Sequence, residues 1–384
     1  MTDILLHTAS ATFEAACRVG ILPEGHRSRE LHGHSYVARL RAQLPNDWAE
    51  FPGVESEQLQ ARLIDCVSPL DYALLNEHIN VPTDENIARW LIKQLSQSSP
   101  LASDLSVPNV TAPCLSIPGI EQVGIGSTRQ QGADLDTNGN AHIWRRYRFE
   151  AAHQLPNVPK GHQCGRMHGH GFEVILHVNQ NLSQTDMGVD YDHIDACWAP
   201  IHQILDHTCL NDIAGLENPT SEMLAAWIWQ QLSNRLENLS WVTVYETVTA
   251  GCHFDGKQYR IWKEQRFESA VRLQQAPKSD QRRQLHGHSY LLRLHLSAGL
   301  DPVQGWTVDY GDVKSLFKPV YETLDHNPLN QLSNIQDANL TSIVHWIRDQ
   351  TKNVLPQLDR IDLEQTPGCG VILGWGKNSP ALPS

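Results

Sequence analysis

One tripeptide, His-Gly-His, occurs three times in this chain of 384 residues and constrains its fold more than any other feature. Each tripeptide follows a Phe-Glu-(Ala/Ser)-Ala segment and precedes an apolar stretch, and a Leu-Asp-x and then a Leu-Asn pattern come later in each copy. The tripeptides are His32-Gly33-His34, His168-Gly169-His170 and His286-Gly287-His288. Four features in the same order, three times, indicate a triplicated unit. We divide the chain into residues 1–140, 141–262 and 263–384, here called the first, middle and third copies.

The middle copy predicts the secondary structure of the unit. Segments rich in β-branched and aromatic residues predict strands, and apolar residues at helical spacing predict helices. The predicted order is strands over 143–152 and 172–178, helices over 192–205 and 221–236, and strands over 241–247 and 253–262. Thr220 is the expected N-cap of the second helix, and residues 132–140 form the expected linker.

The resulting β-β-α-α-β-β unit is an α+β fold. Four strands with two helices on one face leave two sheet edges open, which proteins avoid. Three such units remove the open edges by closing side to side into one twelve-stranded antiparallel barrel with the helices outside.

Composition excludes several classes of partner. The formal net charge of −13 argues against binding nucleic acid or an anionic membrane surface. No apolar run is long enough for a membrane span, and the start of the chain lacks the pattern of a secretory signal. The eight cysteines are scattered, as in cytoplasmic proteins with free thiols. We therefore expect a cytoplasmic protein with a small-molecule substrate.

The histidines of the middle copy predict a metal site. His168 and His170 lie two apart, so on a strand both side chains point to one face. His153 ends the preceding predicted strand, and antiparallel pairing would bring it beside them. Three imidazoles and one open position suit catalytic zinc, although ligand type alone leaves iron and copper open.

Cys164 lies on the loop before this pair of histidines, together with Lys160, His162 and Arg166. Nearby cations lower the pKa of a thiol and favour the thiolate. A thiolate at this position could move protons on a metal-bound substrate.

The middle copy resembles the 6-pyruvoyl-tetrahydropterin synthase superfamily, most of all its bacterial 6-carboxytetrahydropterin synthase branch. The resemblance spans residues 143–262, and the flanking copies match it in part. The motifs that carry it are Phe149 to His153, Cys164-x-x-x-His168-Gly169-His170, Val189-Asp190-Tyr191, Leu205-Asp206-His207, Pro219-Thr220-Ser221-Glu222 and Tyr245-Glu246-Thr247.

The resemblance implies a tunnel fold that converts 7,8-dihydroneopterin triphosphate to 6-carboxytetrahydropterin, acetaldehyde and triphosphate, on the route to queuosine. It implies Zn²⁺ held by His153, His168 and His170, which acidifies the hydroxyls of the substrate side chain. Cys164 would transfer protons and the Asp206-His207 pair would act as the relay. Glu246 would anchor the pterin by accepting its N–H groups. The candidate cations for the triphosphate are Lys160, Arg166 and Arg282.

The outer copies depart from this pattern. In the first copy Cys17 replaces the metal-binding His153, Ser28 replaces Cys164, Tyr72 replaces the relay histidine and Ser127 replaces Glu246. Cys17, His32 and His34 remain a candidate second zinc site.

In the third copy Val271 and Arg282 replace the metal histidine and the cysteine, yet Asp325-His326 and Val308-Asp309-Tyr310-Gly311-Asp312 persist. Sites of the family form between units, so we expect that His326 could serve Cys164 across an interface. We also expect a homodimer of such pseudo-trimers.

Two other interpretations stay open. The same fold and zinc could yield 6-pyruvoyltetrahydropterin or a folate precursor. Alternatively, the chain is a non-catalytic pterin-binding protein, as two altered copies suggest. The complete set of Cys164, Asp206-His207 and Glu246 favours the enzyme.

Overall fold

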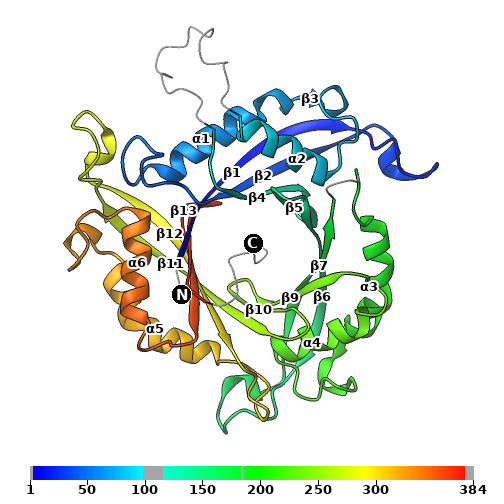
Figure 1. Ribbon diagram of the computed structural model, residues 1–384. Coiled ribbons are helices and arrows are strands. Elements are labelled where there is room, and N and C mark those ends of the chain that lie inside the picture. The colour runs from blue at the N-terminus through cyan, green and yellow to red at the C-terminus, as the bar shows by residue number, and fades with distance from the viewer. Residues whose placement is uncertain (1–2, 98–115, 183–185, 377–384) are drawn as a thin grey trace.

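The computed structural model describes residues 3–97, 116–182 and 186–376. Its strands form a closed ring and its helices lie outside that ring (Figure 1). Within these ranges, no helix combines the length and the apolarity that crossing a membrane requires.

Each copy contributes four long strands and two α-helices to the described part of the chain. The strands are β1 (Ile4–Cys17), β2 (His32–Ala42), β4 (Ile120–Thr128) and β5 (Gln131–Asp136); β6 (Asn140–His153), β7 (His168–Asn181), β9 (Leu239–Thr247) and β10 (Ala250–Phe254); and β11 (Tyr259–Val271), β12 (His286–Ala298), β13 (Leu358–Thr366) and β14 (Cys369–Gly374). The helices are α1 (Glu55–Val67), α2 (Asp84–Leu95), α3 (Tyr191–Leu205), α4 (Ser221–Leu232), α5 (Tyr310–Leu324) and α6 (Leu340–Thr351).

The strands pair in sequence order, and β14 pairs with β1, so the sheet closes. All twelve long strands are antiparallel to their neighbours, and β5–β6, β10–β11 and β14–β1 join the copies. The short strands β3 (Ala73–Leu74) and β8 (Thr208–Cys209) add parallel pairs to β1 and β6. The predicted twelve-stranded barrel with outer helices is confirmed.

Two local predictions are wrong because short turns separate the copies. Residues 253–262 are not one strand: Asp255 accepts hydrogen bonds from the N–H groups of Lys257 and Gln258, and Gly256 has a φ of 88°. The boundary at 262 therefore falls inside β11. Residues 132–140 are no linker, because β5 occupies most of them.

The outer face of the sheet packs against the helices through one apolar side of each strand. In the middle copy this core joins Ile143 and Val174 of the sheet to Ile194 of α3 and Leu224 of α4, all of them buried. Thr220 caps α4 by accepting a hydrogen bond from the backbone N–H of Met223, as predicted. Matching aromatic pairs stack across the first two strands of each copy: Phe13–Tyr36, Phe149–Phe172 and Phe267–Tyr290.

The inner face of the sheet carries a chain of buried polar side chains, because residues alternate between the two faces. His142 Nε2 lies 3.0 Å from His177 Nδ1. The Thr243 hydroxyl bridges His177 and His253, at 2.9 and 2.8 Å. Further round the barrel, His295 Nε2 lies 3.1 Å from a carboxylate oxygen of Asp362. Burial lowers the pKa of all four imidazoles, that of His295 to about 3.

Candidate active site between the middle and third copies

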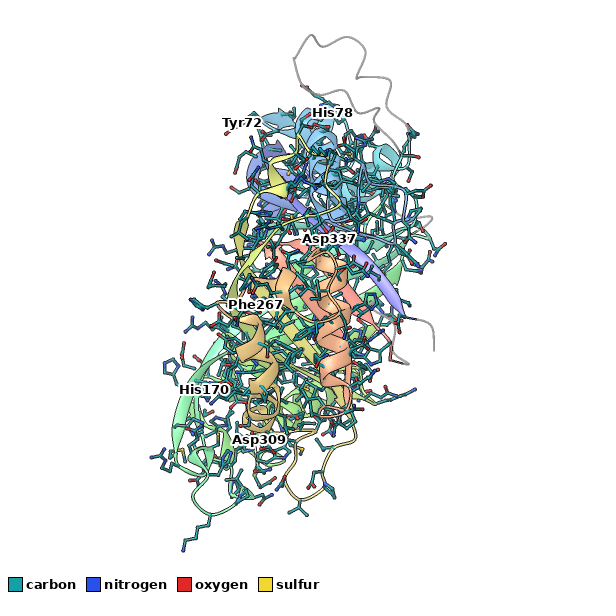
Figure 2. All side chains as sticks on the ribbon, turned by 90° about the vertical axis from the view of Figure 1, so that its left-hand side faces the viewer. Tyr72, His78, His170, Phe267, Asp309 and Asp337 are labelled. Carbon is teal, nitrogen blue, oxygen red and sulfur yellow. The ribbon has the colours of Figure 1, made fainter. Side chains whose placement is uncertain are left out.

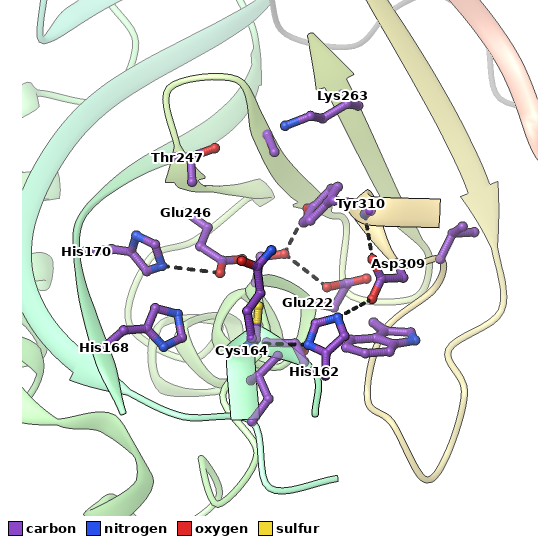
Figure 3. A pocket seen from close by; sticks show the side chains of 18 of the residues that line it. His162, Cys164, His168, His170, Glu222, Glu246, Thr247, Lys263, Asp309 and Tyr310 are labelled. Atoms are coloured by element: carbon purple, nitrogen blue, oxygen red, sulfur yellow. Dashed lines mark hydrogen bonds and ion pairs between the residues drawn. The ribbon is translucent and has the colours of Figure 1, made fainter. Parts of the chain in front are cut away.

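A cavity of about 630 Å³ lies where the middle copy meets the third copy. The middle copy contributes the loop before β7, the start of β7, the first turn of α4 and the end of β9; the third copy contributes the start of β11 and the first turn of α5 (Figure 3). His170 of the middle copy and Asp309 of the third copy lie toward the same end of the molecule (Figure 2). The cavity is of a size usual for small-molecule sites.

The three predicted metal ligands come together on the outer face of the sheet. His153 ends β6 and pairs directly with His168 at the start of β7, and His170 follows on the same face. The ring centroids of His153 and His168 are 4.5 Å apart, and those of His153 and His170 are 5.2 Å apart.

These imidazoles fit a metal ion in their present geometry. Backbone carbonyls of Pro219 and Arg166 lie 3.1 and 2.8 Å from Nδ1 of His153 and His168, so each Nδ1–H donates and each Nε2 keeps its lone pair. The Nε2 atoms of His153 and His170 are buried without a hydrogen-bond partner. Burial lowers the pKa of both rings, that of His153 to about 4, so both are neutral, as ligands must be.

Glu246 lies next to these three histidines. Its Oε1 lies 3.5 Å from Nε2 of His170 and 3.9 Å from Nε2 of His153. One ligand atom from each of His153, His168, His170 and Glu246 fits within 4.8 Å of all the others. Burial and, next, repulsion from Glu222 raise the pKa of the Glu246 carboxyl to about 7.

Cys164 lines the cavity from the loop before β7, as the sequence predicted. The expectation that neighbouring cations lower its pKa is wrong. Burial raises the pKa of the thiol, and the carboxylates of Glu246 and Asp309 raise it further. Lys160 of the same loop does not line the cavity.

The third copy supplies one wall that sequence reasoning did not assign to the site. His162 Nε2 lies 3.1 Å from the carboxylate of Asp309, while His162 Nδ1 accepts a hydrogen bond from the backbone N–H of Cys164. The hydroxyl groups of Tyr310 and Ser221 lie 3.0 Å apart. The conspicuous segment Val308 to Asp312 was the signal that could have identified this wall.

Further hydrogen bonds join the middle and third copies beside the cavity. Glu222, in the first turn of α4, is buried and accepts hydrogen bonds from the backbone N–H and the hydroxyl of Thr307. The Thr220 hydroxyl donates to the backbone carbonyl of Gly305. The middle copy alone would therefore lack one side of its own site.

The cations near the cavity differ in part from those predicted. Arg166 lines it, and so do Lys263 of β11 and Lys314 of α5. Arg282 does not: it lies at the interface of the third and first copies, where Asp280 and Glu57 bind its guanidinium at 2.6 Å each.

Neither Asp-His pair lines the cavity. Asp206 accepts a hydrogen bond from the backbone N–H of Glu150 and lies 2.8 Å from Nδ1 of His207, whose side chain is 78% exposed. Asp325 and His326 repeat this arrangement in the third copy, with His326 76% exposed. Within this chain, the structure brings neither histidine to Cys164.

The other two interfaces carry different residues at the positions that form this cavity. Strand register places Ser127 where β9 carries Glu246, and the cavity beside Cys17 is only about 80 Å³. At the interface of the third and first copies, Val271 is buried at the position of His153, and the ion pairs of Arg282 lie where Cys164 would be.

Comparison with known proteins gives matches in all three copies. The sequence model of the family described as 6-pyruvoyl tetrahydropterin synthase matches residues 7–112, 142–257 and 260–374. A 6-carboxy-5,6,7,8-tetrahydropterin synthase of Synechocystis sp. is 39% identical over 119 residues, which cover 29% of this chain and 91% of that protein. A dihydroneopterin monophosphate aldolase of Pyrococcus furiosus is 27% identical over 103 residues, which cover 26% of this chain and 87% of that protein.

Among solved structures, Caenorhabditis elegans 6-pyruvoyl tetrahydropterin synthase matches with a TM-score of 0.28 and 21% identity, covering 31% of this chain and 95% of that chain. The three regions matched by the family model together make up most of the sequence. The chain therefore belongs to the 6-pyruvoyl tetrahydropterin synthase family.

Proposed function

We propose that this protein converts 7,8-dihydroneopterin triphosphate to 6-carboxytetrahydropterin, acetaldehyde and triphosphate, a carbon–carbon lyase reaction on the queuosine route, at the cavity between the middle and third copies. One observation carries the proposal: Cys164, His168, His170 and Glu246 line a single cavity, and His153 lies directly behind this lining within ligand distance of His168, His170 and Glu246. The similarity to the Synechocystis protein named for this product supports the choice of reaction.

His153, His168 and His170 would hold Zn²⁺, because one ring nitrogen of each lies within 4.8 Å of the others. Zinc bound there would supply Lewis-acid chemistry, which lowers the pKa of the hydroxyls on the substrate side chain. The backbone carbonyls of Pro219 and Arg166 hold two of the rings in the required orientation.

The remaining side chains divide the other tasks. Cys164 would carry a proton to and from the carbon atoms of the substrate side chain, since its thiol lines the cavity beside His168. Glu246 would accept N–H groups of the pterin ring. Lys263 and Lys314, with Arg166, would offset the negative charge of the substrate.

We propose that residues 141–262 form the catalytic copy and that residues 1–140 and 263–384 are degenerate copies. Degenerate does not mean dispensable: the third copy supplies Asp309, Tyr310 and Lys314 to the site. This contribution accounts for the survival of its Val308 to Asp312 segment without metal ligands of its own.

We further propose a homodimer in which a second chain supplies the relay histidine. His207 and His326 are exposed, and neither lines the cavity of its own chain. Three apolar residues that precede the His-Gly-His motifs, Leu31, Met167 and Leu285, are 67, 52 and 59% exposed, and they would pack against the second ring.

Separate His207→Ala and His326→Ala variants test this arrangement. Loss of turnover in one of them identifies the relay, and full turnover in both rejects it. If the sedimentation coefficient shows a monomer under conditions that support turnover, the dimer is also rejected. We place the reaction in the cytoplasm, because all seven cysteines of the described ranges are free thiols.

Two other functions would use the same site: formation of a different pterin product, and pterin binding without catalysis. The Pyrococcus relative is named as an aldolase, so a shorter or different pterin product is the second candidate. Incubating the zinc-loaded protein with 7,8-dihydroneopterin triphosphate and identifying the products by mass separates these candidates. Cys164→Ala is the control, and a wild type that binds pterin but forms no product would identify a binding protein.

A further inference from the structure

The interface between the first and middle copies holds a second group of metal-ligating side chains. Cys17 ends β1 and pairs directly with His32 at the start of β2, in the register that joins His153 to His168. The Cys17 sulfur, one ring nitrogen of His32 and one of His34 all lie within 4.8 Å of one another. The sulfur-to-Nε2 distance between Cys17 and His32 is 3.6 Å.

That distance is the one a shared tetrahedral ion requires. Zinc bonds of about 2.3 Å to sulfur and about 2.1 Å to nitrogen, at a tetrahedral angle, separate the two ligand atoms by about 3.6 Å. The backbone carbonyl of Glu30 lies 2.8 Å from Nδ1 of His32, so Nδ1–H donates there and the Nε2 lone pair points to the thiol. The same contact orients His168 in the middle copy.

The surroundings of Cys17 suit a bound thiolate. Its side chain is buried, and the Tyr36 hydroxyl lies 3.3 Å from the sulfur, where it can donate a hydrogen bond to a thiolate. In the middle copy the equivalent of Tyr36 is Phe172, whose neighbour is the uncharged ring of His153. The third copy also carries a tyrosine, Tyr290, at this position, so what distinguishes the first copy is that the Tyr36 hydroxyl contacts a sulfur.

The adjoining cavity excludes a pterin but admits an ion with water. Its volume of about 80 Å³ is far below the roughly 300 to 1,000 Å³ of small-molecule pockets and is enough for a few waters. Asp84 lines this cavity, and its carboxylate accepts hydrogen bonds from the hydroxyls of Ser127 and Tyr191, each at 2.8 Å.

We propose that Cys17, His32 and His34 bind a second zinc ion through one thiolate and two imidazoles, with water as the fourth ligand. Binding forms one zinc–sulfur and two zinc–nitrogen bonds, and the proton of the Cys17 thiol passes to solvent. The ion ties the end of β1 to the start of β2 beside the middle copy. The proposal is independent of the reaction proposed above.

The third copy provides an internal comparison. His286 and His288 keep the same spacing, but Val271 stands where Cys17 and His153 stand, and valine cannot ligate. Within the described ranges, no comparable group of ligands appears in the third copy. The other group of possible ligands, His26, Asp190 and Asp192, contains no thiol, and Arg27 binds Asp192 at 2.7 Å, so we expect the chain to bind two ions.

Cobalt substitution tests the site, because a thiolate ligand to Co²⁺ gives a near-ultraviolet charge-transfer band that imidazole and carboxylate ligands do not. The full-length chain, loaded with Co²⁺, should bind two ions and show the band. Cys17→Ser should bind one ion without the band. Cys17→His, which copies the middle site, should restore two ions but not the band, and Cys164→Ala should keep both the band and two ions.

Three results would overturn the proposal. These are a wild type that binds one ion without the band, a band that survives in Cys17→Ser, or a band that disappears in Cys164→Ala. Circular dichroism checks that each variant is folded, and Cys17→His gives a second reading where Cys17→Ser is unstable. Since the readout is metal binding, failure of the proposed reaction would leave its outcome unaffected.

Discussion

Lowering the pH should destabilise the barrel through the imidazoles buried on its inner face, and His295 tests this most cleanly. Its pKa in the folded protein is about 3, so the ring stays neutral at pH 5, whereas in the unfolded chain it gains a proton below about pH 6.5. Between these two pKa values the unfolded state binds more protons than the folded state. The free energy of unfolding therefore decreases as the pH is lowered. For one such residue the loss between pH 7 and pH 5 is about 2 kcal/mol.

Other groups act in the opposite direction, so the comparison must isolate one residue. Asp84 and Glu246 have pKa values raised to about 7 by burial, and the folded state takes up their protons as the pH falls. We therefore compare wild type with His295→Gln, whose amide can still donate to Asp362. Urea unfolding at pH 7 and pH 5 should show that wild type loses about 2 kcal/mol more than the variant.

The control is Thr243→Val, which removes the hydroxyl between two other inner-face histidines, His177 and His253, without removing a titratable group. Its cost should be the same at both pH values. If wild type and His295→Gln lose equal stability between pH 7 and pH 5, His295 is not held neutral and the account of the inner face is wrong.

Three further predictions concern the site. A chelator should abolish turnover and leave the far-ultraviolet circular dichroism unchanged, because the barrel is closed by backbone hydrogen bonds rather than by metal. Added zinc should restore turnover. Unfolding on chelation would contradict a purely catalytic role of the metal. Glu246→Gln should lower kcat/KM by roughly 30- to 150-fold, the equivalent of a charged hydrogen bond worth about 2–3 kcal/mol, and steady-state kinetics with unchanged values would remove Glu246 from substrate binding. Asp309→Asn should lower kcat/KM by roughly 5- to 30-fold, because it weakens the hydrogen bond to His162 by about 1–2 kcal/mol. The matched change at the interface of the first and middle copies, Asp190→Asn, should leave kcat/KM unchanged. Equal effects of the two changes would contradict a single active interface.

Sequence periodicity was sufficient for the architecture because the barrel follows from the unit. Once the triple repeat and the four-stranded unit were recognised, open edges required closure, and β14 does pair with β1. The errors came at the junctions. Residues 253–262 have strand-like composition throughout, and only the Asp255-Gly256 turn reveals that two copies meet there.

The candidate site was predictable only where its residues share one copy. His153, His168 and His170 converge through the pairing of two adjacent strands, which spacing along the chain encodes. Asp309 and Lys314 reach the cavity from another copy, and no local pattern specifies which interface they face. The pKa of Cys164 is raised first by burial and next by the carboxylates of Glu246 and Asp309, and of these only Asp309 comes from another copy.

The most direct test of the central claim, that one interface of three is catalytic, is a comparison of matched substitutions in the three repeated motifs. Product formation from 7,8-dihydroneopterin triphosphate would be measured by mass for His32→Ala, His168→Ala and His286→Ala. The account predicts that only His168→Ala abolishes the product, while the other two variants turn over at wild-type rates when folded. Turnover that survives in His168→Ala, or that is lost in folded His32→Ala or His286→Ala, would contradict it.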